Sequence, residues 1–268
     1  MTFFVLVVIA VGVGLLGSML GVGGGLLLVP LLTLFLGVPV KVAIGTSLVC
    51  VVVTSSASQI VYVVRGFTNS RLGMTLEVAT TLGALVGGIT AILVSGRAIF
   101  AVFTVVLVYV LVTMERKPPE RRPADPGSAL AGSFTDPATG DEVAYGVGHL
   151  PGGLALSFVA GNVSGLLGVG GGVIKVPVMN LLMGVPLRAA IATSNLMIGV
   201  TAATGAVIFF GRGLVEPRYA VPTAIGILVG AQLGPRLAGR VSAVLLRRVF
   251  EVLLAVLAVQ MALKAFGV

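Results

Sequence analysis

The sequence predicts an all-α polytopic membrane protein made of two inverted repeats, each with about five helical segments and a short broken or half-helix at a glycine motif. Three observations support this prediction. The chain is strongly apolar, with 57% hydrophobic residues, 10% charged residues and a mean hydropathy of +1.15. Apolar runs long enough to cross about 30 Å of hydrocarbon recur along nearly its whole length. Two distant stretches of the chain are also near copies of each other.

The composition argues against a soluble domain, which needs more charge to cover its surface. A β-barrel is not expected, because the run 101–112 lacks the alternation of barrel strands. The net charge of +8 comes from basic residues between the apolar runs, where they orient helices and meet lipid headgroups rather than nucleic acid. Cys50 is the single cysteine and His149 the single histidine, so we expect no metal site and no cofactor.

An internal repeat organises the chain. Residues 21–47 read GVGGGLLLVPLLTLFLGVPVKVAIGTS, and residues 168–194 read GVGGGVIKVPVMNLLMGVPLRAAIATS. The two stretches align without gaps, and more than half of their positions are identical. The similarity continues downstream, where Arg65 and Gly66 match Arg212 and Gly213. Such self-similarity means that one structural unit occurs twice.

Each repeat is predicted to hold five apolar segments, with residues 1–114 forming the first repeat and residues 150–268 the second. The first 20 residues lack a basic leader region and are kept as a membrane segment. The second segment of each copy is too short for a comfortable span and opens with a glycine cluster, which is typical of a half-helix. The segments are 3–20, 24–37, 42–64, 76–95 and 97–113, then 150–167, 171–184, 189–210, 219–235 and 247–265.

The polar stretch 115–149 separates the repeats. It begins with a basic cluster, which predicts a cytoplasmic loop, and turn residues around 134–143 favour a small hairpin. Five crossings per repeat make the two copies antiparallel and place both termini outside, in a multi-pass protein of the cell inner membrane. If the short segments re-enter instead of crossing, the termini move inside. The basic residues of the cluster are Arg116, Lys117, Arg121 and Arg122.

The glycine clusters are the first candidate site. They either allow tight helix packing or unwind the backbone, which at membrane depth is tolerated only inside protein or beside a cavity. Backbone N–H groups at the start of a half-helix suit an anion, and we favour this interpretation. The predicted substrate-binding residues are Gly23, Gly24, Gly25, Gly170, Gly171 and Gly172.

Hydroxyl and amide side chains at the start of each third segment are the second candidate. They cap helices and join them by hydrogen bonds, or they line the same midplane cavity as the glycine clusters. Both interpretations can hold together. The residues are Thr46, Ser47, Thr193, Ser194 and Asn195.

Ionisable residues inside apolar segments form the third group. Lys175 stands where the first copy has Leu28, and a lysine there either attracts an anion or reaches the membrane surface. Glu77 and Glu251 either carry a proton or pair with an arginine such as Arg248, and we favour the structural pair.

The doubled G-V-G-G-G-x-x-x-V-P stretch, the following G-V-P and A-I-[GA]-T-S segments and the polar middle loop resemble the TauE/SafE family of sulfite exporters over essentially the whole chain. The resemblance implies a secondary carrier of a small sulfur-containing anion, of the sulfite or organosulfonate class, in the bacterial inner membrane. Lys175 has no counterpart in the first copy and is not carried over as a family residue.

Two other functions remain open at this point. One is a non-transporting membrane component, such as an intramembrane enzyme or an assembly factor, and the other is a passive anion channel. An enzyme is not expected, because no intramembrane cluster of acids, bases or metal ligands is visible, and no G-K-[ST] loop binds a nucleotide. The expected partners are therefore a small anion, membrane lipid and a proton or other ion if transport is coupled.

Overall fold

The computed structural model describes residues 2–114, 129–135, 140–237 and 243–267. In this part of the chain, seven helices are long and apolar enough to cross a membrane, which confirms the predicted all-α polytopic fold. The basic cluster at 116–122 lies outside the described residues. The helices are α1 (Thr2–Leu20), α2 (Gly25–Phe35), α3 (Val40–Val64), α4 (Ser70–Leu93), α5 (Gly96–Met114), α6 (Leu150–Leu167), α7 (Gly172–Pro177), the π-helical turn η1 (Val178–Leu182), α8 (Leu187–Gly211), α9 (Pro217–Leu237) and α10 (Ala243–Phe266).

The helices follow the predicted segments closely, and the largest difference is at the start of α4. This helix begins at Ser70 rather than near residue 76. The side chain of Asn69 accepts a hydrogen bond of 3.0 Å from the backbone N–H of Leu72, so it caps the helix before the apolar run begins.

The most extensive helix pairings in the bundle join one repeat to the other. α1 packs along α9, and α4 packs along α6. Since α1 corresponds to α6 and α4 to α9 in the aligned sequences, these are equivalent contacts made twice. α3 packs against its own counterpart α8, and α5 packs against α10. The contacts therefore follow the pattern of a twofold relation between the repeats.

Glycines allow the close approach of the first two helix pairs. A Cβ atom at Gly161 of α6 would clash with the carbonyl oxygen of Thr80 in α4. At the equivalent position, a Cβ atom at Gly14 of α1 would lie 2.7 Å from the carbonyl oxygen of Ile227 in α9. Small residues at such positions let membrane helices pack backbone to backbone.

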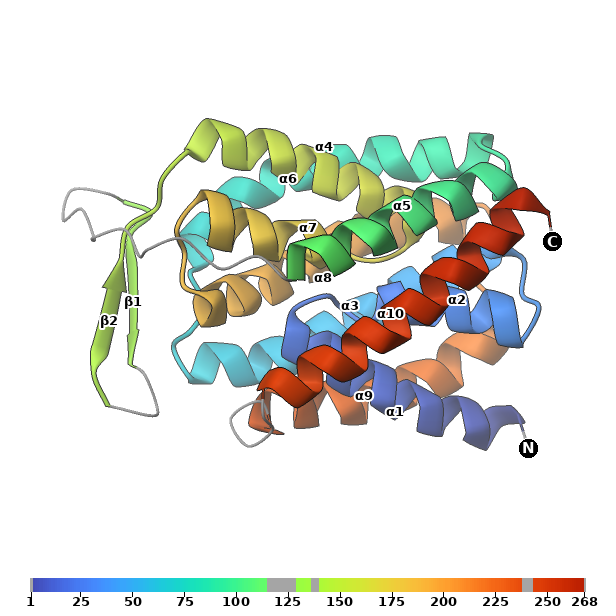
Figure 1. Ribbon diagram of the computed structural model, residues 1–268, viewed down its shortest axis with the longest axis horizontal. Helices are drawn as coiled ribbons and strands as arrows, with labels where there is room; N and C mark the ends of the chain where they lie inside the picture. Colours follow the sequence, from blue (N-terminus) through green and yellow to red (C-terminus); the bar gives the residue numbers. More distant parts are fainter. Residues whose placement is uncertain (1, 115–128, 136–139, 238–242, 268) are drawn as a thin grey trace.

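Both termini lie at one end of the molecule, and the hairpin that follows the first repeat lies at the opposite end (Figure 1). The second repeat thus starts at the end where the first repeat finishes. This is the arrangement of ends that an inverted repeat requires.

The hairpin consists of β1 (Gly132–Thr135) and β2 (Glu142–Tyr145), which pair antiparallel as the turn residues predicted. The ring of Phe134 packs edge-on against Phe67 in the α3–α4 loop, with 5.4 Å between the ring centroids. Burial raises the pKa of the Tyr145 phenol, and a hydrogen bond from Asn69 opposes that rise. The hairpin is therefore attached to the loop between α3 and α4.

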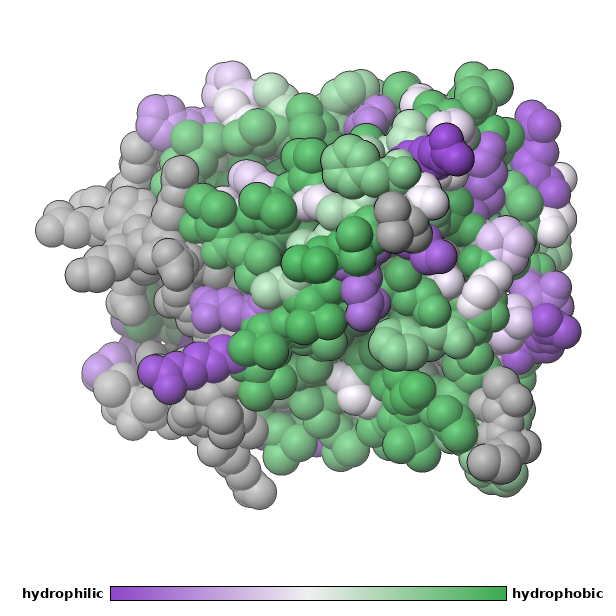
Figure 2. Space-filling view, turned by 45° about the vertical axis from the view of Figure 1, so that its right-hand side comes forward, coloured by the Kyte–Doolittle hydropathy of each residue, from purple (hydrophilic) through white to green (hydrophobic). Residues whose placement is uncertain are grey.

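On the face that Figure 2 shows, the surface is mostly apolar over the middle of the molecule, and hydrophilic side chains gather mostly toward the two ends. Large apolar side chains halfway along the helices are exposed, such as Val105 of α5 at 68% and Leu82 of α4 at 54%. Exposing apolar area to water costs about 25 cal/mol per Å². This surface is therefore suited to hydrocarbon rather than to water.

Candidate functional site

Two glycine loops connect the first helix of each repeat to its half-helix. Gly24 precedes α2 with φ 77°, and Gly171 precedes α7 with φ 74°. Residues with a Cβ atom rarely adopt this left-handed conformation, whereas glycine adopts it readily. The glycine clusters thus allow the chain to turn back sharply between two helices.

The two loops meet near the middle of the two central helices. A Cβ atom at Gly23 would lie 2.9 Å from a methyl carbon of Ile198 and 3.1 Å from one of Val51. A Cβ atom at Gly170 would lie 2.8 Å from each of the same two atoms. Because Val51 lies halfway along α3 and Ile198 halfway along α8, the loops cross at mid-length of the bundle.

The start of each half-helix contacts the loop of the other repeat. A Cβ atom at Gly25 would clash with the carbonyl oxygen of Gly168, and one at Gly172 would clash with the carbonyl oxygen of Gly21. These contacts leave no room for a side chain at either position. The structure therefore brings both predicted glycine clusters into direct contact.

The predicted hydroxyl residues form reciprocal hydrogen bonds between the two repeats. The two serines bond the glycine loops, and the two threonines bond the loops that follow α3 and α8. Ser47 donates a hydrogen bond of 2.9 Å to the carbonyl oxygen of Gly168, and Ser194 donates one of 3.1 Å to that of Gly21. Thr193 accepts a bond of 3.0 Å from the backbone N–H of Asn69. Thr46 accepts the equivalent bond of 3.2 Å from the N–H of Glu216.

Asn195 has no polar counterpart in the first repeat, where Leu48 stands at the aligned position. Its amide nitrogen donates to the carbonyl oxygen of Ile191 at 3.0 Å, and its amide oxygen accepts from Ser58 at 3.2 Å. Asn195 thus links α8 to α3. It is fully buried, as are the four hydroxyl residues.

The closed crossing limits what these groups can offer an anion. An anion needs hydrogen-bond donors to replace its water. The hydroxyl protons of Ser47 and Ser194 are already directed at backbone carbonyl oxygens. These two side chains can serve an anion only after the loops separate from the facing helices.

Lys175 lies in the bundle interior and meets Glu77 there. Its ammonium nitrogen is 3.4 Å from Glu77 Oε2 and donates to Thr201 Oγ1 at 2.6 Å. Thr201 in turn donates to Glu77 Oε1 at 2.6 Å. Lys175 is 1% exposed and Glu77 is 5% exposed. The interpretation that Lys175 reaches the membrane surface is therefore wrong, and the expected arginine partner for Glu77 is wrong as well.

The surroundings of this ion pair contain a further buried hydroxyl. A Cβ atom at Gly171 would lie 3.3 Å from Cβ of Ser164 and 3.3 Å from Cε of Lys175. Ser164 is fully buried, and its hydroxyl oxygen has no hydrogen-bond partner. The charged cluster thus adjoins the second glycine loop.

Sequence reasoning missed Thr201 and Ser164 and did not join Glu77 to Lys175. The repeat alignment contained a signal. Lys175 aligns with Leu28 of the first repeat, and Glu77 aligns with Ala224 of the second repeat. Two opposite charges that both break the repeat in apolar segments are expected to pair.

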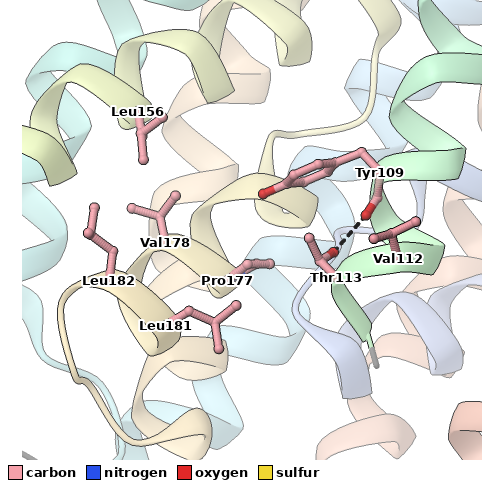
Figure 3. Close-up of a pocket in the computed structure, with 8 residues that line it drawn as sticks. All are labelled: Tyr109, Val112, Thr113, Leu156, Pro177, Val178, Leu181 and Leu182. Atoms are coloured by element: carbon pink, nitrogen blue, oxygen red, sulfur yellow. Dashed lines mark hydrogen bonds between the residues drawn. The ribbon is translucent and has the colours of Figure 1, made fainter. Parts of the chain in front are cut away.

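A surface groove of about 360 Å³ lies on another face of the second half-helix (Figure 3). It runs between α5 and the turn that contains Pro177 and Val178, and Tyr109 extends across it. Its lining is mostly apolar, so it offers an anion few of the hydrogen bonds that water provides. The groove is better suited to an apolar chain than to a small anion.

Comparison with known proteins identifies the family. The sulfite exporter TauE/SafE family profile matches residues 6–261. The chain is 30% identical to the probable membrane transporter protein YunE of Bacillus subtilis, over 87% of this chain and 88% of that protein. It is 29% identical to a probable membrane transporter protein of Xylella fastidiosa, over 92% and 90%. No solved structure matches the chain significantly. The chain therefore belongs to the sulfite exporter TauE/SafE family and is a multi-pass membrane transporter.

Proposed function

We propose that the protein is a secondary transporter that moves a small sulfur-containing anion, of the sulfite or organosulfonate class, across the bacterial inner membrane by alternating access. The substrate class rests on the family name, because the relatives are named only as probable membrane transporters. In this arrangement the polar stretch 115–149 is cytoplasmic and both termini are outside.

The observation that carries the proposal is the crossing of the two glycine loops at mid-length of α3 and α8. Paired broken helices at the midplane, related by an inverted repeat, are a recurring way to build a transport site. The reciprocal bonds of Ser47 and Ser194 mean that both repeats contribute equivalent contacts to this crossing, as a mechanism that alternates between the two repeats requires.

The burial of the crossing favours a carrier over a passive channel. A channel conducts through a continuous wet path. Here the hydroxyl and amide groups at the crossing are fully buried and bonded to the facing repeat. This is the state expected of a carrier that is closed to both sides.

Charge and hydrogen bonding at this level suit an anion. Lys175, which is paired with Glu77 in this state, is a buried cation next to the second glycine loop. The hydroxyls of both repeats can replace part of the water that an anion loses once the loops separate. One lysine with several hydroxyls also binds weakly enough to release the anion, which a dense arginine cluster would hinder.

The enzyme alternative finds less support. Across the described ranges, no group of three His, Cys, Asp or Glu side chains is placed to hold a metal ion. The family is described as a sulfite exporter family, and the named relatives as probable membrane transporter proteins.

Uptake into proteoliposomes tests the proposal. Radiolabelled sulfite, sulfate, thiosulfate and isethionate are supplied to vesicles with purified protein, with and without a proton gradient. We expect saturable uptake of at least one anion, accelerated by unlabelled anion inside, because a carrier exchanges. Uptake that is unaffected by internal anion would favour a channel. No uptake above protein-free vesicles with any of the four would overturn the proposal.

A further inference from the structure

The described helices around the Glu77–Lys175 pair bring no other charge close to it. α6, α7 and α8 surround it together with α4. α6 carries no charged residue, and Lys175 is the single charge on α7. Arg71 lies six residues before Glu77 on α4, about 9 Å along the helix, and Arg188 lies about 20 Å along α8 from Thr201. Glu77 and Lys175 therefore neutralise each other.

The fold itself does not require this pair. The aligned positions in the other half of the bundle are Leu28 on α2, Ala224 on α9 and Thr54 on α3. There the residues aligned with Lys175 and Glu77 are apolar, and the Thr54 hydroxyl donates to the carbonyl oxygen of Cys50 within its own helix. A buried ion pair often stabilises no more than apolar residues of the same volume. Its presence in one half alone points to a role other than packing.

We propose that Lys175 binds the charge of the transported anion and that Glu77 takes up one proton when the anion binds, so that anion and proton move together. This inference rests on the proposed function. It names the proton as the coupling ion and Glu77 as the residue that carries it.

The linkage follows from charge balance. In the empty protein the Glu77 carboxylate neutralises Lys175 at 3.4 Å. An anion that takes its place would leave the carboxylate unpaired beside a second negative charge in a buried site, which is costly. A proton from water bound to the Glu77 carboxylate removes that charge, so one proton is bound for each anion. By reciprocity, a higher proton concentration then tightens anion binding.

The neighbouring hydroxyls are placed to support this exchange. Thr201 bonds both partners, to Lys175 at 2.6 Å and to Glu77 at 2.6 Å, so it holds them in position when their direct contact is lost. Ser164 lies beside Gly171 with a hydroxyl that has no partner. This hydroxyl is available to donate a hydrogen bond to the incoming anion.

The test compares Glu77→Gln with wild type in anion exchange between equal concentrations across the vesicle membrane, from about pH 5.5 to pH 8. The probes are those of the four anions above that exchange in wild type. At each pH, the apparent affinity of the variant is divided by that of the wild type. This ratio removes the effect of protonation of the probe itself, which is the same for both proteins. As the pH rises, we expect the apparent affinity of the wild-type protein for the anion to fall by up to about tenfold per pH unit, which is the slope for one linked proton. Exchange by Glu77→Gln should persist and lose this dependence.

A second readout measures protons directly. Anion added to purified protein in weakly buffered detergent solution should cause proton uptake in wild type, seen with a pH-sensitive dye, and none in Glu77→Gln. Thr201→Val should alter the pH dependence of exchange. The matched control is Thr54→Val, the same change at the aligned position, which should leave that dependence as in wild type.

The outcomes separate the inference from the proposed function. Glu77→Gln that keeps the wild-type pH dependence, or that is inserted and folded but exchanges nothing, would overturn the inference. Equal effects of Thr201→Val and Thr54→Val would also contradict it. A wild-type protein that exchanges none of the probes contradicts the proposed function instead.

Discussion

At the scale of single residues, two serines explain how the centre of the bundle is held closed. Ser47 and Ser194 occupy aligned positions and each bonds the glycine loop of the other repeat. Removal of one hydroxyl leaves a buried carbonyl oxygen without its donor, which costs about 1–3 kcal/mol. We expect Ser47→Ala and Ser194→Ala each to lower the unfolding temperature of the purified protein by a similar amount.

A matched control is Thr90→Ala, which removes an exposed hydroxyl that bonds only within its own helix. It should change the unfolding temperature little. If either serine variant has the same unfolding temperature as Thr90→Ala, that serine hydroxyl does not stabilise the crossing.

The residue types of the site could be predicted, but their partners could not. The repeat alignment singled out the glycines, the hydroxyls and Lys175. It did not pair Ser47 with Gly168, or Lys175 with Glu77, because each pair joins segments about a hundred or more residues apart whose contact depends on the tertiary fold. It left open whether the hydroxyls join helices by hydrogen bonds or line a cavity, and the structure shows Ser47 and Ser194 bonded to the backbone of the facing repeat.

At the scale of elements, the half-helices were predictable because their glycines and short apolar runs are local signals. The continuation of α7 was not. After Pro177 the chain forms the π-helical turn η1, whereas the aligned Pro30 lies within a regular α2. The early start of α4 depends on one capping side chain, Asn69, which the periodicity of apolar residues does not reveal.

The hairpin gives a prediction at this scale. The rings of Phe67 and Phe134 pack at 5.4 Å with an interplanar angle of 76°, an edge-to-face contact worth about 0.5–1.5 kcal/mol beyond burial. A double-mutant cycle of Phe67→Ala and Phe134→Ala should therefore show coupling of that size in unfolding free energy. Strictly additive single effects would mean that the contact between these two rings does not stabilise the protein.

At the scale of the whole molecule, the ends of the chain and the reciprocal contacts support an inverted repeat. The α3–α4 loop, at about 65–69, and its counterpart at about 212–216 should then face opposite sides of the membrane. Single cysteines at Arg65 and Arg212 should be labelled by an impermeant thiol reagent from opposite sides. The native Cys50 is buried and serves as the unlabelled background. Labelling of both from one side would exclude the inverted arrangement.

The most direct measurement of the central claim, transport at the crossing of the glycine loops, is anion flux per inserted protein in Gly24→Val and Gly171→Val. Both substitutions strain a left-handed backbone and press on neighbouring atoms at 3.2 Å and 2.9 Å respectively. The controls Gly66→Val and Gly213→Val strain a similar backbone but meet no atom within 4 Å. We expect flux to be lost in the first pair, with the protein still inserted and monodisperse, and largely kept in the controls. Near-normal flux in both loop variants would contradict the account.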